Sequence, residues 1–200
     1  MGWGPETALA IVDLQNDFAD PKGSLYVRGG EEVVPVANRL IEQAVAGGSL
    51  LVYSKDWHPE HTPHFRSSGG IWPEHCRRDT WGAQFVRGVA RGSPALFIHK
   101  GTGGEDGYSM FTVRDTETDD RRQTGLAAIL RRLRVERLVI GGIATDYCVR
   151  HTALEALALG FRVVVVREAV RAVDLEPGDG ERALREIAAH GGVVADVASL

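Results

Sequence analysis

Short apolar runs alternate with amphipathic segments along nearly the whole chain, and this alternation restricts the fold more than any other feature. Six runs are rich in β-branched residues and almost continuously apolar, as expected for strands buried on both faces of a parallel sheet. They are residues 8–14, 49–54, 95–100, 137–143, 161–168 and 192–197. Helical periodicity predicts helices between them, over residues 31–48, 122–135, 146–160 and 181–192. The pattern predicts an α/β fold that is doubly wound, with a mainly parallel six-stranded sheet and helices on both faces.

The helix expected over residues 146–160 has a capping signal at each end. Thr145 precedes it as a candidate N-cap, and Gly160 supplies the glycine that commonly ends a helix. One long segment, from about residue 56 to residue 94, has no strong periodicity. Loops of that length inside a compact domain are usually functional.

The composition excludes several classes of protein. With 200 residues and 44% hydrophobic content, we expect one domain spanning residues 1–200. The net charge of −4 offers no basic surface for nucleic acid. No apolar run approaches the roughly 20 residues of a membrane-spanning helix, and the N-terminus does not resemble a signal peptide. Two cysteines are too few for a disulfide framework. We therefore expect a cytoplasmic protein that binds neither nucleic acid nor membranes.

Polar residues stand where three of the expected strands end. Asp13 and Lys100 close two strands, and Cys148 follows a third. Each also has a simpler interpretation: a turn-forming aspartate, a solvated lysine, and a small buried thiol. Cys148 lies in the first turn of the expected helix, where the helix N-terminus lowers a thiol pKa and offers N–H groups to an oxyanion. This setting favours a nucleophile, whereas Cys76 has no such setting and is interpreted as structural.

The segment KDWHPEHTPHF, residues 55–65, concentrates groups that bind metals. Asp56 and His58 lie on the same side of an extended segment, His64 follows beyond two prolines, and His75 follows another proline-marked turn. Three imidazoles and a carboxylate suit zinc, iron or manganese. His61 is the surplus histidine, and a surface position is its simpler interpretation. A polar loop with a chance run of histidines is the alternative for the whole cluster, so the spacing alone leaves the ligand set open.

Several motifs occur in a fixed order along nearly the whole chain. They are VDLQNDF with GSLYV after it, KDWHP with a later HF, WPEHC, HKGT followed by YSMF, and GIATDYCV followed by HTALEA. Together they resemble the nicotinamidases and pyrazinamidase-type amidases of the isochorismatase-like cysteine hydrolases. The resemblance implies an isochorismatase-like fold, which is a Rossmann-like sandwich.

The resemblance also implies a role for individual residues. The implied catalytic triad is Asp13, Lys100 and Cys148. The implied metal ligands are Asp56, His58, His64 and His75, which leaves His61 in a variable loop position. The implied aromatic walls of the substrate pocket are Phe18, Trp72 and Tyr108. The bond between Ile143 and Ala144 matches a cis peptide of the family, which would direct the N–H groups of Ala144 and Cys148 at the substrate oxygen.

The implied activity is hydrolysis of nicotinamide to nicotinate and ammonia, and of pyrazinamide as well, through a thioester on Cys148. Lys100 and the helix N-terminus are expected to favour the thiolate. One divalent metal is implied, zinc in the first place and iron or manganese as alternatives. The partner is a small amide, a role in NAD salvage follows, and the fold often forms homo-oligomers. Two other interpretations are an amidase for another small amide and a non-catalytic metal-binding module.

The chain departs from the family pattern at two places. Trp81 stands where a proline or a small residue is more usual, and the loop GTGGEDG, residues 101–107, is rich in glycine. We expect neither to contact the catalytic triad, and both are candidates for altering the preference among aromatic amides.

Overall fold

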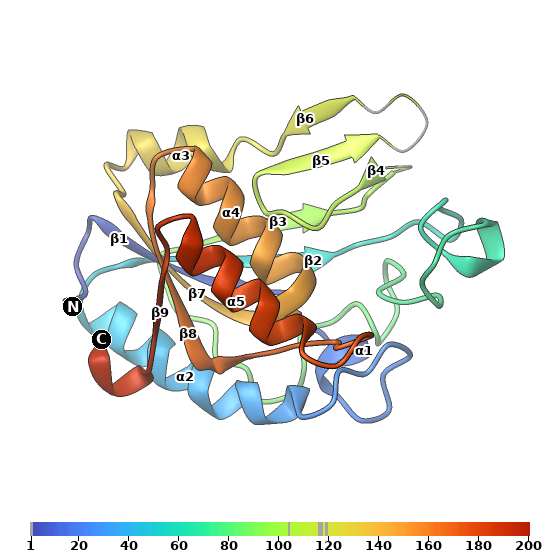
Figure 1. Cartoon of the computed structure of the whole chain (residues 1–200), viewed down its shortest axis with the longest axis horizontal. Helices are drawn as coiled ribbons and strands as arrows, with labels where there is room; N and C mark the ends of the chain where they lie inside the picture. Colours follow the sequence, from blue (N-terminus) through green and yellow to red (C-terminus); the bar gives the residue numbers. More distant parts are fainter. Residues whose placement is uncertain (1, 104, 116–117, 119) are drawn as a thin grey trace.

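A six-stranded sheet, all of whose neighbouring strands are parallel, forms the centre of the computed structural model (Figure 1). The structure describes residues 2–103, 105–115, 118 and 120–200. The sheet comprises β1 (Thr7–Val12), β2 (Leu50–Asp56), β3 (Ala95–Lys100), β7 (Arg137–Ile143), β8 (Arg162–Arg171) and β9 (Val193–Ala195). Their order is β3-β2-β1-β7-β8-β9, so the winding reverses between β1 and β7. The predicted sheet is confirmed, and ligands of such sheets bind at the carboxyl ends of the strands near this reversal.

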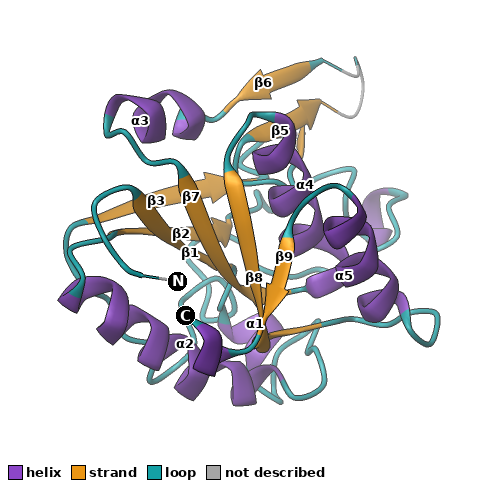
Figure 2. Ribbon diagram, turned by 60° about the vertical axis from the view of Figure 1, so that its left-hand side comes forward, coloured by secondary structure: helices purple, strands orange, loops and turns teal. Residues whose placement is uncertain are grey.

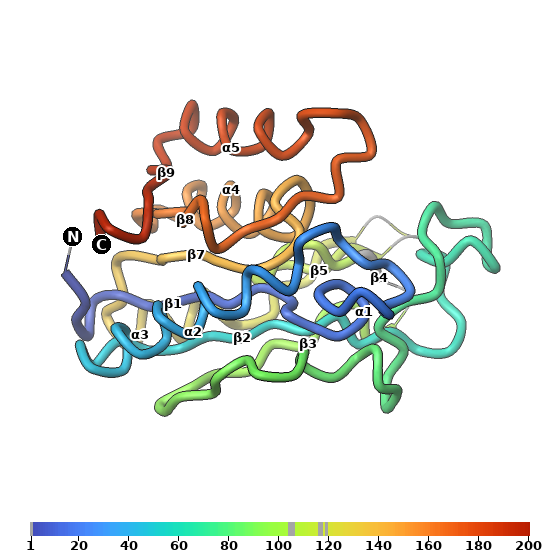
Figure 3. Tube along the Cα trace, turned by 90° about the horizontal axis from the view of Figure 1, so that it is seen from below, coloured from blue at the N-terminus to red at the C-terminus, as the bar shows by residue number. Residues whose placement is uncertain are grey.

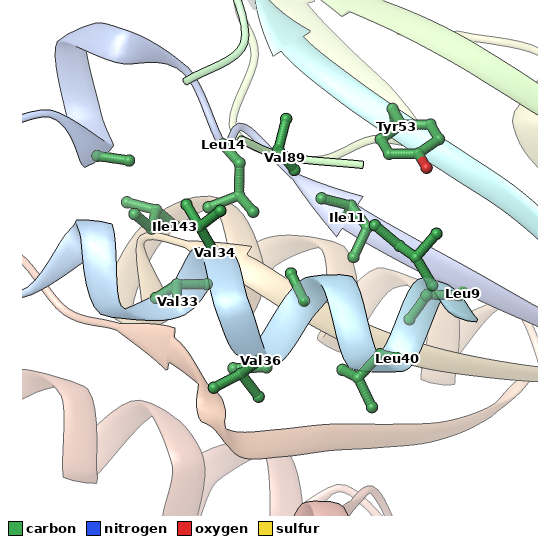
Figure 4. Packing of buried hydrophobic residues seen from close by; sticks show 14 of the residues in the cluster. Leu9, Ile11, Leu14, Val33, Val34, Val36, Leu40, Tyr53, Val89 and Ile143 are labelled. Carbon is green, nitrogen blue, oxygen red and sulfur yellow. The ribbon is translucent and has the colours of Figure 1, made fainter. Parts of the chain in front are cut away.

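Helices cover both faces of the sheet (Figure 2). The larger ones are α2 (Gly30–Ala46), α3 (Leu126–Arg132), α4 (Arg150–Ala158) and α5 (Asp179–Ala189). Alternate residues of β1 point to opposite faces. Leu9 and Ile11 pack with Leu40 of α2 (Figure 4), whereas Ala8 and Ala10 belong to the cluster on the side of the other three helices. No helix in the described part of the chain is long and apolar enough to cross a bilayer.

A small antiparallel sheet, which the sequence pattern did not predict, lies beside the main one. It consists of β4 (Glu105–Asp106), β5 (Thr112–Asp115) and β6 (Arg121–Gln123). The helix expected from residue 122 therefore begins only at Leu126. Gly125, at φ 88°, separates it from β6. The start expected for this helix is wrong because residues 121–123 pair with β5.

The segment around Cys148 also differs from the prediction. A π-helical turn, Thr145–Val149, precedes α4, and the residue before this turn is Ala144. Thr145 is therefore inside the helical turn and is not its N-cap, so that expectation is wrong. Gly160 lies just beyond the end of α4 at φ 89°, a left-handed conformation that suits glycine, and the predicted end signal is confirmed.

The connection from β2 to β3 is the long loop that the sequence predicts. Apart from one 3₁₀ turn, Arg66–Ser68, it has no helix or strand over residues 57–94. In Figures 1 and 3 the first part of this loop extends beyond the carboxyl end of β2. The short helix α1 (Asn16–Ala19) follows β1 at the same end, and a 3₁₀ turn, Val197–Ser199, ends the chain. The histidine-rich loop thus lies at the end of the sheet where ligands are expected.

Candidate active site

Three residues from the carboxyl ends of different strands meet at the end of the sheet where the loop of residues 57–94 lies. Lys100 ends β3, Asp13 follows β1, and Cys148 follows β7. The Nζ atom of Lys100 lies 2.7 Å from Oδ2 of Asp13 and 3.6 Å from Sγ of Cys148. All three side chains are buried. Lys100 Nζ also forms an ion pair with Asp56 and donates a 2.9 Å hydrogen bond to the carbonyl oxygen of Gly107. A buried ammonium group therefore connects two carboxylates and a thiol.

Burial and charge together set the protonation of this group. Burial lowers the pKa of Lys100, but the carboxylates of Asp13 and Asp56 raise it well above its ordinary value. Burial raises the pKa of the Asp13 carboxyl, although Lys100 opposes the shift. Burial also raises the pKa of the Cys148 thiol well above its ordinary value, although Lys100 opposes this shift. The expectation of a lowered thiol pKa is therefore wrong, because burial outweighs the lysine. The resting pair is a protonated thiol beside a carboxylate of increased basicity.

The glycine-rich loop after β3 contacts both this group and the histidines, contrary to expectation. Besides the hydrogen bond from Lys100 to Gly107, Nδ1 of His58 lies 3.1 Å from the carbonyl oxygen of Gly101. Gly101 has φ 63°, and a Cβ atom there would lie 2.4 Å from the His58 ring. Trp81, by contrast, is 52% exposed and is not among the described residues that line the pocket. The loop is therefore part of the site, and Trp81 is not.

The four residues implied as metal ligands lie together. One ring nitrogen from each of His58, His64 and His75 lies within 4.8 Å of the other two. Oδ2 of Asp56 lies 3.6 Å from Nε2 of His58 and 3.8 Å from Nε2 of His75. His61 is exposed. The structure thus gathers one carboxylate and three imidazoles, and it leaves the surplus histidine on the surface.

The chemistry of these side chains fits a divalent cation. The carbonyl oxygens of Gly101 and Pro73 accept from Nδ1 of His58 and of His75, so each ring carries its proton on Nδ1. The Nε2 atoms of the same two rings lie 3.6 Å and 3.8 Å from Oδ2 of Asp56. Nε2 of His58 is buried and has no hydrogen-bond partner among the described residues. Burial lowers the pKa of His64 and of His75 to about 4, so both rings are neutral near pH 7. Neutral imidazoles and a carboxylate are ordinary ligands of zinc and similar ions.

One pocket opens onto both groups. Its lining includes Cys148 of the first group and three of the four residues of the second, and all three aromatic residues expected as walls: Phe18, Trp72 and Tyr108. The indole N–H of Trp72 donates a 2.9 Å hydrogen bond to the hydroxyl oxygen of Tyr108. Ala144 also lines the pocket, and the Ile143–Ala144 peptide bond is cis, as the resemblance implied. Most of the site residues named from the sequence therefore line one cavity, whereas Asp13, Lys100 and His58 are not part of its described lining.

The matching family model, "Isochorismatase domain", covers residues 7–199 of the chain. The chain belongs to the isochorismatase family. The resemblance stated from its motifs is confirmed, because the match covers all of the motifs in one alignment.

Individual relatives of this isochorismatase-family chain are similar over nearly its whole length. The nicotinamidase of Escherichia coli (strain K12) is 36% identical in an alignment 203 residues long, which covers 94% of this chain and 93% of the relative. The structure of the pyrazinamidase of Pyrococcus horikoshii in complex with zinc is 41% identical, with a TM-score of 0.84, and the match covers 96% of this chain and 99% of that one. The structure of PnC1 from L. infantum in complex with nicotinate is 32% identical, with a TM-score of 0.91, and the match covers 100% of this chain and 98% of that one.

Other pocket residues of this isochorismatase-family site were not named from the sequence. They are Leu25, Val27, Tyr147 and Val173; Ile143, named from the sequence only for its peptide bond, also lines the pocket. The ring centroid of Tyr147 lies 4.9 Å from that of Trp72 and 5.5 Å from that of Tyr108, so it completes an aromatic cluster. Leu25, Val27 and Tyr147 belong to the motifs GSLYV and GIATDYCV, which therefore carried a signal for them. Val173 comes from the loop after β8 and had no such signal.

Gln15 is another residue of the site that was not named from the sequence, and its side chain forms hydrogen bonds with the backbone of Asp56. β1 pairs with β2 only as far as Tyr53, so the backbone of Asp56 has no strand partner on that side. Oε1 of Gln15 accepts the Asp56 N–H at 2.8 Å, and Nε2 donates to the Asp56 carbonyl at 2.7 Å and to that of Ala83 at 3.0 Å. The amide thus replaces a strand at this position. Its place in VDLQNDF was the available signal.

Replacing Gln15 by methionine tests this support. Two buried backbone groups of Asp56 lose their partner, so we expect the free energy of unfolding to fall by about 2–4 kcal/mol. Zinc affinity should fall about tenfold or more, because residues that orient ligands usually contribute that much. Urea unfolding and zinc titration measure the two effects. Gln84→Met, which replaces an exposed amide, is the matched control. Equal zinc affinity in the two variants would contradict the role of Gln15.

Proposed function

We propose that this chain is a nicotinamidase, which hydrolyses nicotinamide to nicotinate and ammonia and acts on pyrazinamide in the same way. The observation that carries the proposal is the placement of Cys148 on an aromatic-walled pocket that also contains Asp56, His64 and His75. Such a pocket accepts a small planar ring and presents its substituent to the thiol. The names of two relatives, a nicotinamidase and a pyrazinamidase, support the same substrate class.

The first half of the reaction follows from the positions of Asp13 and Cys148. The carboxylate of Asp13, made more basic by burial, takes the thiol proton. The sulfur forms a bond to the carboxamide carbon, and negative charge moves to the amide oxygen. The N–H groups of Ala144 and Cys148 stabilise that oxyanion. Asp13 then gives its proton to the nitrogen, the C–N bond breaks, and ammonia leaves a thioester on Cys148.

The second half uses the same carboxylate again. Asp13 takes a proton from water, whose oxygen attacks the thioester carbon. The C–S bond breaks, Asp13 returns the proton to the sulfur, and the nicotinic acid that forms releases its own proton to solvent as nicotinate. The positive charge of Lys100 stabilises the carboxylate and the thiolate in turn, since its Nζ atom lies within 3.6 Å of both Oδ2 and Sγ. No change in oxidation state occurs, and the enzyme is restored.

Asp56, His58, His64 and His75 would hold one divalent cation beside the pocket. We propose zinc, and iron or manganese suit the same ligands. When bound, the cation acts as a Lewis acid toward a ring nitrogen of the substrate. The histidines contribute orientation, because the carbonyl groups of Gly101 and Pro73 fix the rings of His58 and His75.

A pair of histidine variants tests the ligand set. Replacing His64 by alanine should lower zinc affinity by about 100-fold or more, because one of four ligands is lost. His61→Ala removes an exposed histidine from the same loop and should leave zinc affinity unchanged. Zinc titration of the metal-free variants measures both. If His64→Ala kept its zinc affinity and His61→Ala lost it, His61 and not His64 would be the ligand.

The proposed function is tested by measuring ammonia release by the purified, zinc-loaded protein from nicotinamide, pyrazinamide and benzamide. We expect turnover of the first two and much slower turnover of benzamide, which lacks the ring nitrogen. Release only from another small amide, such as a maleamate-type compound, would favour the second amidase interpretation. No release from any amide, together with tight zinc binding, would favour the metal-binding module. The cytoplasmic location, the homo-oligomer and the role in NAD salvage remain predictions from the sequence.

A further inference from the structure

Ser54 of β2 contacts Asp13 at two points. The Oγ atom of Ser54 donates a 2.7 Å hydrogen bond to Oδ1 of Asp13, and it accepts one from the Asp13 backbone N–H at 3.3 Å. Ser54 is fully buried and is not among the described residues that line the pocket. Its hydroxyl therefore acts on Asp13 and does not reach the substrate.

The backbone of Asp13 explains why such a contact is useful. β1 ends at Val12, and Asp13 has φ 46°, in the left-handed region that non-glycine residues seldom occupy. Such a conformation is strained and persists only when neighbouring groups hold it. The pairing of β1 with β2 stops at Ile11 and Tyr53, so the N–H group of Asp13 needs another acceptor. The adjacent Ser54 provides it.

The two oxygens of the Asp13 carboxylate have different partners. Oδ1 accepts from Ser54, whereas Oδ2 lies 2.7 Å from Nζ of Lys100. A carboxylate held at one oxygen cannot rotate freely about its last bond, so the other oxygen keeps its direction. A carboxylate oxygen of Asp13 also lies within 4.8 Å of Sγ of Cys148. The serine hydroxyl thus fixes the carboxylate on the side opposite to the groups with which it exchanges protons.

We propose that Ser54 is a positioning residue for the general base of this enzyme. Its hydroxyl holds Asp13 in the left-handed conformation and keeps one carboxylate oxygen directed toward Lys100 and the thiol. The proposal rests on the proposed function only in taking Asp13 as the base that deprotonates Cys148. Displacement of a reacting group by about 1 Å can lower a rate by about 100-fold, so loss of this hydroxyl should affect turnover far more than substrate binding.

Three variants separate the hydroxyl from the packing around it. Ser54→Ala removes the hydroxyl, Ser54→Thr keeps it, and Ser54→Val has the shape of threonine without it. In Ser54→Ala we expect kcat on nicotinamide to fall about 10- to 100-fold, with KM within about threefold of the parent value and full zinc content. Ser54→Thr should exceed Ser54→Val in kcat by about tenfold or more. Thermal melting of all three shows whether each variant is folded.

A second readout does not require that nicotinamide is the substrate. Iodoacetamide alkylates thiols through the thiolate, so its rate at Cys148, followed by peptide mass spectrometry, reports proton transfer to Asp13. We expect the parent and Ser54→Thr to react about tenfold faster than Ser54→Ala and Ser54→Val. If the parent releases no ammonia from nicotinamide but this order holds, the proposed substrate is wrong and the role of Ser54 stands. Equal alkylation and equal kcat for Ser54→Thr and Ser54→Val would overturn the role of Ser54.

Discussion

Replacing Cys148 by alanine should reduce ammonia release from nicotinamide by about 10,000-fold or more, because the variant has no atom that can form the thioester. The zinc content should not change, because the ligands proposed for the metal are Asp56 and the three histidines. The other group whose atoms could hold an ion, Asp13, Asp56 and Cys148, already surrounds the Nζ atom of Lys100. Steady-state ammonia release and metal analysis of the same preparation measure both quantities. The substitution removes one buried sulfur, so the fold should be retained.

The second cysteine of the chain is the matched control. Cys76 is also buried, and burial also raises its thiol pKa well above the ordinary value. Cys76 does not line the pocket as described, so Cys76→Ala should keep kcat within about threefold of the parent value. Near-normal turnover by Cys148→Ala would show that the thiol is not the nucleophile. Loss of turnover in both variants would show a structural effect instead.

Replacing Lys100 by methionine should have the largest effect on stability. The ammonium group of Lys100 is fully buried between the carboxylates of Asp13 and Asp56. Without it, two buried carboxyl groups face each other with no cation, and removing one partner of a buried ion pair typically costs about 3–5 kcal/mol. Turnover should fall as well. Repulsion between the two carboxylates favours retention of a proton, and Asp13 must be ionised to take the proton of the Cys148 thiol. Urea unfolding in the presence of a chelator measures the stability without a contribution from metal.

An exposed ion pair provides the comparison for this variant. Nη2 of Arg162 lies 2.9 Å from the carboxylate of Glu136, with side chains 65% and 68% exposed. Arg162→Met should change the free energy of unfolding by less than about 1 kcal/mol, since water already screens this pair. A similar small change in Lys100→Met would mean that Lys100 does not hold the two carboxylates together in solution.

The main sheet was predictable because its signal is local. Strands buried on both faces need continuous apolar runs, and helices on the faces need a period near 3.6 residues. Those runs match β1, β2, β3, β7, β8 and β9 within a few residues. The antiparallel strands β4–β6 have no such runs, because their residues are mostly polar; β6 is exposed and β5 is mainly half-buried. Pairing between segments, which no local pattern records, determines them.

Part of the site was also predictable from the sequence. Asp13, Lys100 and Cys148 stand at strand ends, so a parallel sheet places them at one edge whatever the details of packing. The set of histidines was left open by spacing and was named through the resemblance. The structure gathers His58, His64 and His75 and leaves His61 exposed, but their role as ligands remains to be measured.

The sequence by itself determined the type of fold, the edge of the sheet that carries the polar side chains, and the family. Those properties depend on residue type and order, which are visible in a chain of letters. Only the tertiary structure decided that the Cys148 thiol rests protonated, that the loop through Gly107 contacts Lys100, and that Gln15 and Ser54 hold Asp56 and Asp13. These properties depend on burial and on hydrogen bonds that no local pattern records. Two of the bonds, Gln15–Asp56 and Asp13–Ser54, join residues 41 positions apart, and the third, Lys100–Gly107, closes a loop. Desolvation and hydrogen bonding act through space, so they exist only after the chain has folded.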